Sequence, residues 1–162
     1  MTRSLIPPRR PIRRGILLVP ALAVLGALTA VPALANEATV TSGDIHAFAT
    51  SSDQGITGHA TMVRTADGKT IVTVHVAGLA PDTAYGSHVH RQACADGNAG
   101  THYRFDATGP ALPPNEIWPV FTTNAGGVGN GRAVVDAAAG RAAIAIVIHA
   151  PGGAKIACAD LT

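Results

Sequence analysis

After the first 35 residues, hydrophobic and polar positions alternate in short segments rich in Val, Ile and Thr and separated by Gly, Asp, Asn and Pro. A two-residue period with such separators is typical of β-strands joined by turns. The pattern predicts strands at Thr39–Ala49, Gly58–Thr65, Thr70–Val76, Thr83–His90, Ile117–Thr123, Gly131–Asp136, Ala142–His149 and Ala154–Cys158. Since no segment has helical periodicity, we expect an all-β fold, a Greek-key barrel or sandwich of about eight antiparallel strands.

Three local patterns add detail about a turn, the core and one long loop. Asp67-Gly68 lies between the second and third predicted strands and indicates a hairpin turn. Ala142–His149 is almost continuously apolar, which is typical of a strand buried on both faces. Arg91–Asn115 has no strand pattern and contains three prolines, and irregular loops of this length usually carry function.

The N-terminal segment has a different pattern, which is typical of a secretory signal peptide. Five arginines precede an apolar stretch at Ile16–Val31, and small residues follow at Ala33–Ala35. A transmembrane anchor is the alternative, which the proline and glycine inside the apolar stretch disfavour. We expect a signal peptide over 1–35, cleaved near Ala35-Asn36, and one secreted or periplasmic domain over 36–162.

Cleavage would also change the charge of the protein. The basic pI of about 8.8 depends on the five arginines of the signal. After residue 35 there remain seven basic and ten acidic residues, a net charge of −3. Neither nucleic acid nor, after cleavage, a membrane is therefore an expected partner.

The two cysteines, Cys94 and Cys158, both follow the predicted cleavage point. An exported protein meets an oxidising compartment, so one disulfide is expected, with two free buried thiols as the alternative. Closing a loop of about 65 residues would stabilise the fold by roughly 4 kcal/mol.

Four histidines stand where they could bind a metal. His88 and His90 are two residues apart on a predicted strand and therefore share a face. His102 lies in the long loop, and His149 ends the apolar strand. Imidazole is a good ligand for first-row transition metals, although a His-x-His pair alone is a weak signal.

The segments around these histidines resemble the copper/zinc superoxide dismutase family, in the same order along almost the whole chain after residue 35. Val74–His90 resembles its Gly-Leu turn and Gly-x-His-Val-His copper strand. Gly100–Tyr103 resembles the Gly-x-His-aromatic motif of the bridging histidine, and Val147–His149 the setting of the fourth copper ligand. Lys155–Cys158 resembles the segment with the active-site cation and the second half-cystine, and Cys94 matches the loop cysteine.

The resemblance implies a role for each histidine. His88, His90 and His149 would hold copper in both oxidation states. His102 would bind Cu(II), release Cu(I) and carry a proton to the departing peroxide, since imidazole accepts protons near neutral pH. The substrate would be superoxide, a small anion that is converted to dioxygen and hydrogen peroxide.

The zinc site of the family has no counterpart in this sequence. The family takes two further histidines and an aspartate from the loop after the bridging histidine, and no histidine occurs between His102 and His149. His46, His59 and His75 fall on the first three predicted strands and are interpreted as surface or strand residues. The expected cofactor is therefore copper, without zinc.

A glutamate is expected to replace zinc. The segment Ala150–Ala157 is much shorter than the charged guiding loop of the zinc-containing enzymes, and this resembles the copper-only branch. In that branch a glutamate orients the bridging histidine. Glu116 is the candidate, since a carboxylate that accepts Nδ1–H of His102 would direct Nε2 at copper. The alternative for Glu116 is an ordinary surface acid.

Three further residues complete the predicted site region. Lys155 stands where the family has arginine, so it keeps the charge and loses the planar fork. Arg91, beside His90, is a second candidate cation but is more simply a solvated loop residue. Trp118 is interpreted as a packing residue.

Several alternatives remain open. A non-enzymatic copper-binding or copper-buffering protein on the same fold would use the same ligands. A cupin or His-liganded zinc hydrolase lacks its expected glutamate after the His-x-His pair, and a cupredoxin lacks a methionine near either cysteine. A metal-free secreted sandwich would leave the four histidines unexplained. The sequence does not indicate the oligomeric state.

Overall fold

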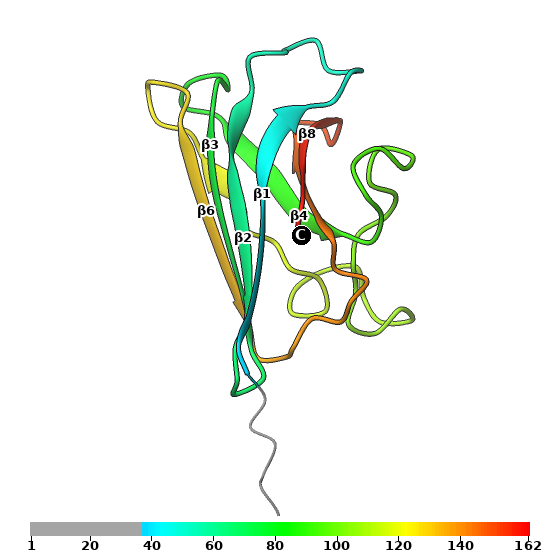
Figure 1. Cartoon of the computed structure of the whole chain (residues 1–162). Coiled ribbons are helices and arrows are strands. Elements are labelled where there is room, and N and C mark those ends of the chain that lie inside the picture. Colours follow the sequence, from blue (N-terminus) through cyan, green and yellow to red (C-terminus); the bar gives the residue numbers. More distant parts are fainter. Residues whose placement is uncertain (1–36) are drawn as a thin grey trace, which may run out of the picture. The chain divides into compact units, whose positions relative to one another are not determined.

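The computed structural model describes residues 37–162, so the predicted signal peptide lies outside the described residues. These residues form eight β-strands (Figure 1). The strands are β1 (Thr39–Ala47), β2 (Thr57–Arg64), β3 (Thr70–Ala77), β4 (Ala84–His90), β5 (Phe121–Thr122), β6 (Gly129–Val135), β7 (Ala145–His149) and β8 (Lys155–Asp160). Within this part of the chain, no helix is long and apolar enough to cross a membrane.

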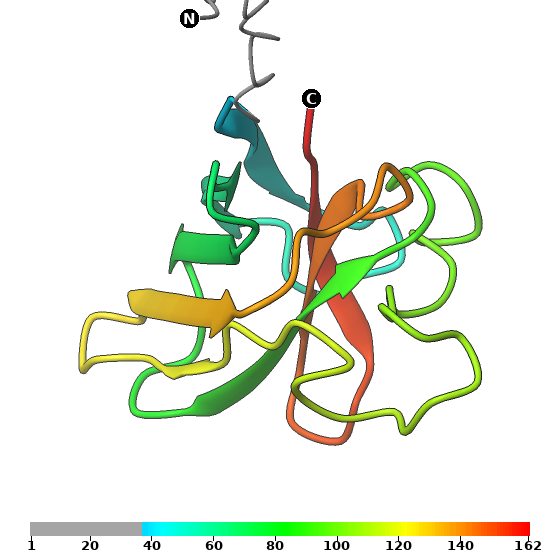
Figure 2. The same cartoon turned by 90° about the horizontal axis from the view of Figure 1, so that it is seen from below.

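All strand pairs are antiparallel, and together they make one nearly closed barrel. The order across the sheet is β5-β4-β7-β8-β1-β2-β3-β6, so the neighbours β4–β7, β8–β1 and β3–β6 are distant in sequence. The outermost strands, β5 and β6, follow each other along the chain through a tight turn in which Asn124 N–H donates to the Val128 carbonyl. Seen from below, the strands surround a common interior (Figure 2). The predicted all-β Greek-key fold is confirmed.

Alternation along the strands determines which side chains fill the interior. On β3, Val72, Val74 and Val76 are buried, whereas Thr73 and His75 between them are exposed. This is the two-residue period of a sheet with one dry face. All five residues of β7 are buried, as its continuous apolar pattern predicted, because the barrel lies on one side and the long loop covers the other.

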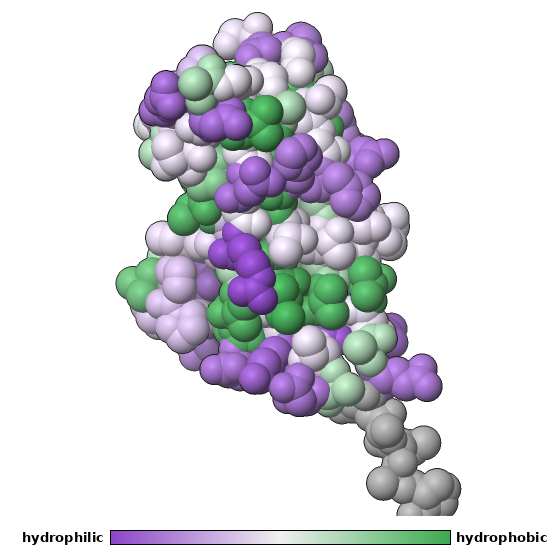
Figure 3. All heavy atoms as spheres, turned by 90° about the vertical axis from the view of Figure 1, so that its left-hand side faces the viewer, coloured by the Kyte–Doolittle hydropathy of each residue, from purple (hydrophilic) through white to green (hydrophobic). Residues whose placement is uncertain are grey.

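The outer face of β6, β3 and β2 is mostly polar and has an apolar stripe near one end (Figure 3). Strand register places Val40, Val63, Ile71 and Val134 in one row across four strands. Val40 and Val134 are 63% and 46% exposed. The stripe lies on strands that carry none of the four candidate histidines.

Some strand boundaries differ from the sequence prediction. Of Ile117–Thr123, only Phe121–Thr122 forms a strand, because Pro119 has no N–H to donate to a ladder. Ile117 still accepts a hydrogen bond from Val89 N–H. The strand predicted from Ala142 begins at Ala145, since Ala143 N–H closes a turn onto the Gly140 carbonyl.

The long loop was predicted correctly as irregular. It lies beside β4 and β8, on the side of the barrel away from β6 (Figure 1). It forms an isolated β-bridge to β4 between His90 and His102, and Tyr103 N–H donates to the Val89 carbonyl at 2.8 Å. The loop therefore folds back over the outer face of β4.

Candidate metal centre

Four histidines from three parts of the chain meet between the barrel wall and the long loop. On β4, Tyr85, Ser87 and Val89 point into the barrel, so the alternate residues His88 and His90 point outward beneath the loop. His149 ends β7, opposite Gly86 of β4, at a register irregularity in its pairing with β8. Such irregularities redirect side chains.

The four imidazoles are close enough to share one ion. Five of the six ring pairs have centroids 4.2 to 5.6 Å apart. One nitrogen from each ring lies within 4.8 Å of the corresponding nitrogen of the others. The predicted set His88, His90, His102 and His149 is therefore brought together by the fold and could hold a metal ion.

Three of the rings are oriented through Nδ1. His90 Nδ1–H donates to the carbonyls of Ala99 and Gly100, both at 3.3 Å. His149 Nδ1–H donates to the Gly153 carbonyl at 3.0 Å. Since a carbonyl only accepts, Nδ1 carries the proton, and Nε2 of His90 and of His149 has the free lone pair.

His88 differs from the other three, because its buried Nδ1 has no hydrogen-bond partner among the described residues. A buried nitrogen without a partner is costly, and each one calls for an explanation. The Nε2 atoms of His90 and His149 face each other at 3.3 Å. These nitrogens could bind a metal ion, which would accept their lone pairs together.

The buried rings are neutral at physiological pH. Burial, followed by the neighbouring charges of His102 and His149, lowers the pKa of His88 to about 3. The same causes, again with burial first, lower the pKa of His90 to about 3. Burial also lowers the pKa of His149. Neutral imidazole is the form that binds metals, so protons compete weakly at these three residues.

Glu116 is the buried partner of His102. It is 1% exposed, and its Oε2 accepts hydrogen bonds from His102 Nδ1 at 2.7 Å and from Trp118 Nε1 at 2.8 Å. Oε1 accepts a hydrogen bond from Arg104 Nε at 2.9 Å. Burial by itself would raise the pKa of Glu116, but the bonds from Trp118, His102 and Arg104 lower it, so the carboxylate is ionised.

Sequence reasoning missed Arg104 and gave Trp118 only a packing role. The Trp118 ring does pack against His88, with centroids 5.0 Å apart, and it also donates to Glu116. Both residues carry a signal in the sequence, since Arg104 is two residues after His102 and Trp118 is two residues after Glu116. In extended chain, residues two apart point to the same side.

Lys155 and Arg91 line a pocket of about 580 Å³ that also includes His90, His102 and Arg104. The Lys155 ammonium donates to the carbonyls of Asn98, at 2.7 Å, and Gly100. Burial lowers the pKa of Lys155. Lys155 is thus next to the histidines, as predicted, but it is bound to the loop backbone. Arg91 is exposed.

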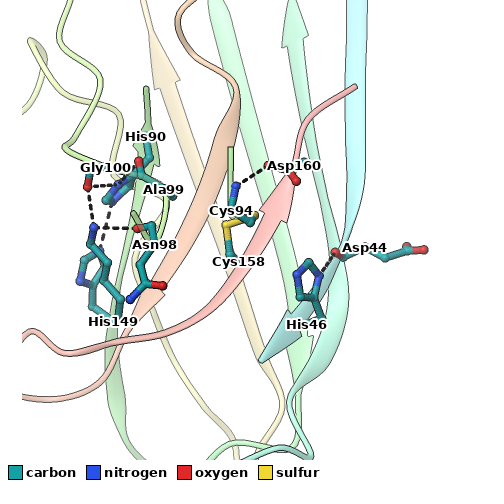
Figure 4. Close-up of a disulfide and its surroundings, with 11 residues drawn as sticks. Asp44, His46, His90, Cys94, Asn98, Ala99, Gly100, His149, Cys158 and Asp160 are labelled. Carbon is teal, nitrogen blue, oxygen red and sulfur yellow. Dashed lines mark hydrogen bonds between the residues drawn. A yellow bond between two sulfur atoms is a disulfide. The ribbon is translucent and has the colours of Figure 1, made fainter. Parts of the chain in front are cut away.

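The predicted disulfide is present between Cys94 and Cys158, with Cα atoms 5.8 Å apart. Cys94 N–H also donates to Asp160 Oδ1 at 2.7 Å, which attaches the loop to β8 at a second point. Figure 4 shows His90 and His149 on one side of the disulfide and His46 on the other. The disulfide therefore fixes the long loop, which covers the histidines, to β8 of the barrel.

The remaining histidines lie apart from this cluster, on the exposed face of β1, β2 and β3. His59 Nδ1 is 2.9 Å from Asp44 Oδ1, and His75 Nδ1 is 2.8 Å from Asn130 Oδ1. His46 is also exposed. Their sequence interpretation as surface and strand residues agrees with this placement.

Comparisons with known proteins extend as far as the fold. No protein-family model matches the sequence, and no curated protein matches it. Among solved structures, the crystal structure of the clock protein EA4 is similar, with 20% sequence identity and a TM-score of 0.57. The match covers 75% of this chain and 92% of that chain. At this identity the likeness shows a shared barrel fold and nothing about activity.

Proposed function

We propose that this protein is an exported superoxide dismutase with a single copper ion, of the copper-only type that the sequence motifs resemble. The observation that carries the proposal is the convergence of four imidazoles, three with Nδ1 bound to oxygen and one with Nδ1 buried and unbonded. Two superoxide ions and two protons would become dioxygen and hydrogen peroxide. Both products are uncharged and would leave the site as neutral molecules.

The residues divide the work between holding the ion and handling the proton. A bound copper ion would supply reversible one-electron chemistry. His88, His90 and His149 would hold it, since their low proton affinity favours the metal. The His102 side chain is 29% exposed and lines the pocket, so its Nε2 is an atom at which a proton can be held near the substrate.

Glu116 supports a site without zinc. A histidine that bridges two metals uses both ring nitrogens, but His102 Nδ1 is bonded to the Glu116 carboxylate. Asp106, the other acid between His102 and β5, is exposed and accepts hydrogen bonds from Thr108. The Glu116 carboxylate would thus orient His102 in place of a second metal ion.

An activity assay tests the proposal directly. Protein exported from the full-length chain and loaded with copper should dismute superoxide in pulse radiolysis, and His149→Ala should lose most of this rate along with its copper. His75→Ala, an exposed residue of β3 that lies apart from the cluster, is the matched control and should keep both. Full copper occupancy without dismutation would favour the alternative of a copper buffer or carrier.

Metal analysis tests the single-ion part separately. Elemental analysis after exposure to both metals should find about one copper and no tightly bound zinc per chain. A full equivalent of zinc that resists dialysis would contradict the copper-only assignment.

A further inference from the structure

We infer that Arg104 is the residue that receives the substrate anion in this site, and that Lys155 mainly anchors the loop. The inference rests on the proposed function, because it concerns the anion that approaches the four-histidine cluster. It differs from the assignment that the motif resemblance implies, in which Lys155 is the cation that attracts the substrate anion.

The hydrogen bonds of Lys155 are the first reason. An ammonium group has three N–H donors, and Lys155 directs two of them at the carbonyls of Asn98 and Gly100. Gly100 is one of the two residues that orient His90. Lys155 therefore fixes the backbone that positions a candidate ligand, and only one of its three N–H donors is left for a third partner.

The donors of Arg104 are the second reason. Its Nε donates to Glu116 Oε1, and among the described residues nothing accepts a hydrogen bond from its two terminal nitrogens. Its side chain is 35% exposed. A guanidinium has a fixed fork of donors that suits a small anion better than a single rotating ammonium. Arg104 thus has both a fixed orientation and unused donors.

The pocket supplies the third reason. Arg104, Arg91 and Lys155 are the charged residues that line it, and no acidic side chain of the described chain does so. His102 and His90 form part of the same wall. Since Glu116 binds His102 with one oxygen and Arg104 with the other, the guanidinium has a fixed position relative to the His102 ring. An anion on Arg104 would lie beside the candidate metal ligands.

Azide binding to the copper-loaded protein tests this without an activity assay. In Arg104→Gln, the azide dissociation constant, read from the visible copper spectrum, should rise about tenfold, the effect of losing one charge-assisted hydrogen-bonding group. Arg104→Lys keeps the charge without the fork and should give a rise of about threefold. Arg91→Gln, which removes an equal charge from the same pocket, is the control and should change the constant less than twofold.

Two results would overturn the inference. One is a wild-type azide affinity in Arg104→Gln. An unchanged copper EPR spectrum of this variant would show that His102 is still in place. The other is a larger loss of affinity in Lys155→Gln than in Arg104→Gln, which would return the anion to Lys155.

A second measurement separates this inference from the proposed function, because it needs no copper. Phosphate added to the metal-free protein should produce a saturable shift of the Arg104 Nε–H NMR signal and a smaller one at Arg91. Absence of a saturable shift would contradict anion binding at Arg104 even if the protein were a dismutase. A clear shift in a protein without dismutase activity would keep the anion site and exclude only the reaction.

Discussion

At the scale of single residues, Glu116 is a buried acid with three hydrogen-bond donors around its carboxylate. Its carboxylate is 1% exposed and accepts three hydrogen bonds, from His102, Arg104 and Trp118. A buried charge is tolerated only when it is paired and fully bonded. Glu116 therefore determines the tautomer of His102 and holds the Arg104 guanidinium in place through Nε at the same time.

Replacing Glu116 by Gln should keep copper bound and slow turnover by about tenfold to a hundredfold, because Nδ1 of His102 loses its charged acceptor. The rate is measured by pulse radiolysis and the copper content by elemental analysis. Asp106→Asn, which neutralises an exposed acid ten residues before Glu116, is the control and should have the wild-type rate. Equal rates in the two variants would make Glu116 a purely structural residue.

At the scale of elements, a covalent bond and several polar contacts hold the long loop to β8, in addition to its contacts with β4. The disulfide joins Cys94 to Cys158, Cys94 N–H reaches Asp160, and the Lys155 ammonium reaches the carbonyls of Asn98 and Gly100. The loop in turn orients His90 through the carbonyls of Ala99 and Gly100. Strand β8 thus positions a ligand that belongs to β4.

Removal of the disulfide should therefore affect both stability and metal binding. In the double variant Cys94→Ser, Cys158→Ser, the free energy of unfolding in urea should fall by about 4 kcal/mol, since a long loop is no longer closed in the unfolded chain. Copper affinity, measured by competition with a chelator, should fall as well, because His90 loses its fixed acceptors. Wild-type protein treated with reductant should behave in the same way. An unchanged copper affinity would show that the loop holds its position without the covalent bond.

Boundaries of the elements were less predictable than their number. The sequence indicated all eight strands, but it extended the fifth to Ile117 and started the seventh at Ala142. Pro119 and the turn closed by Ala143 N–H interrupt these segments although their composition is strand-like. The β-propensity of a residue describes how well its side chain fits a pleated sheet. Pairing with the next strand also requires a backbone N–H in the correct register.

At the scale of the whole molecule, closure of the barrel brings together segments that are far apart in sequence. Strand β7 pairs with β4, so His149 and Gly86 become neighbours, and β8 pairs with β1. The site is then buried between the barrel wall and the loop, which lowers the pKa of His88 and of His90 to about 3. Folding of the metal-free protein must therefore keep these rings uncharged.

This burial predicts how the stability of the metal-free protein depends on pH. Between pH 6.5, the ordinary pKa of histidine, and about 3, the unfolded chain binds protons at His88 and His90 that the folded chain does not. The free energy of unfolding should therefore decrease as pH falls through this range, by at most about 1.4 kcal/mol per pH unit for each histidine.

Urea unfolding of the metal-free protein at pH 7, 6 and 5 measures this effect, and at these pH values the carboxyl groups contribute little. His90→Asn should reduce the pH dependence by about half, the share of His88 remaining, whereas His75→Asn, at an exposed histidine, should leave it unchanged. A wild-type protein with equal stability at pH 7 and pH 5 would show that the rings are not buried as neutral groups.

The sequence by itself determined the strand pattern and the cysteine pair, because these depend on residue type and on a local period. The four histidines and Glu116 were candidates chosen from motifs that resemble those of a known family. Only the tertiary structure decided which ring nitrogens are free, that Trp118 and Arg104 share the Glu116 carboxylate, and that Lys155 is bound to the loop backbone. Each of these features depends on which way a side chain points relative to groups that barrel closure and the disulfide bring close to it. Sequence spacing does not specify such directions, since they depend on contacts between residues far apart in the chain.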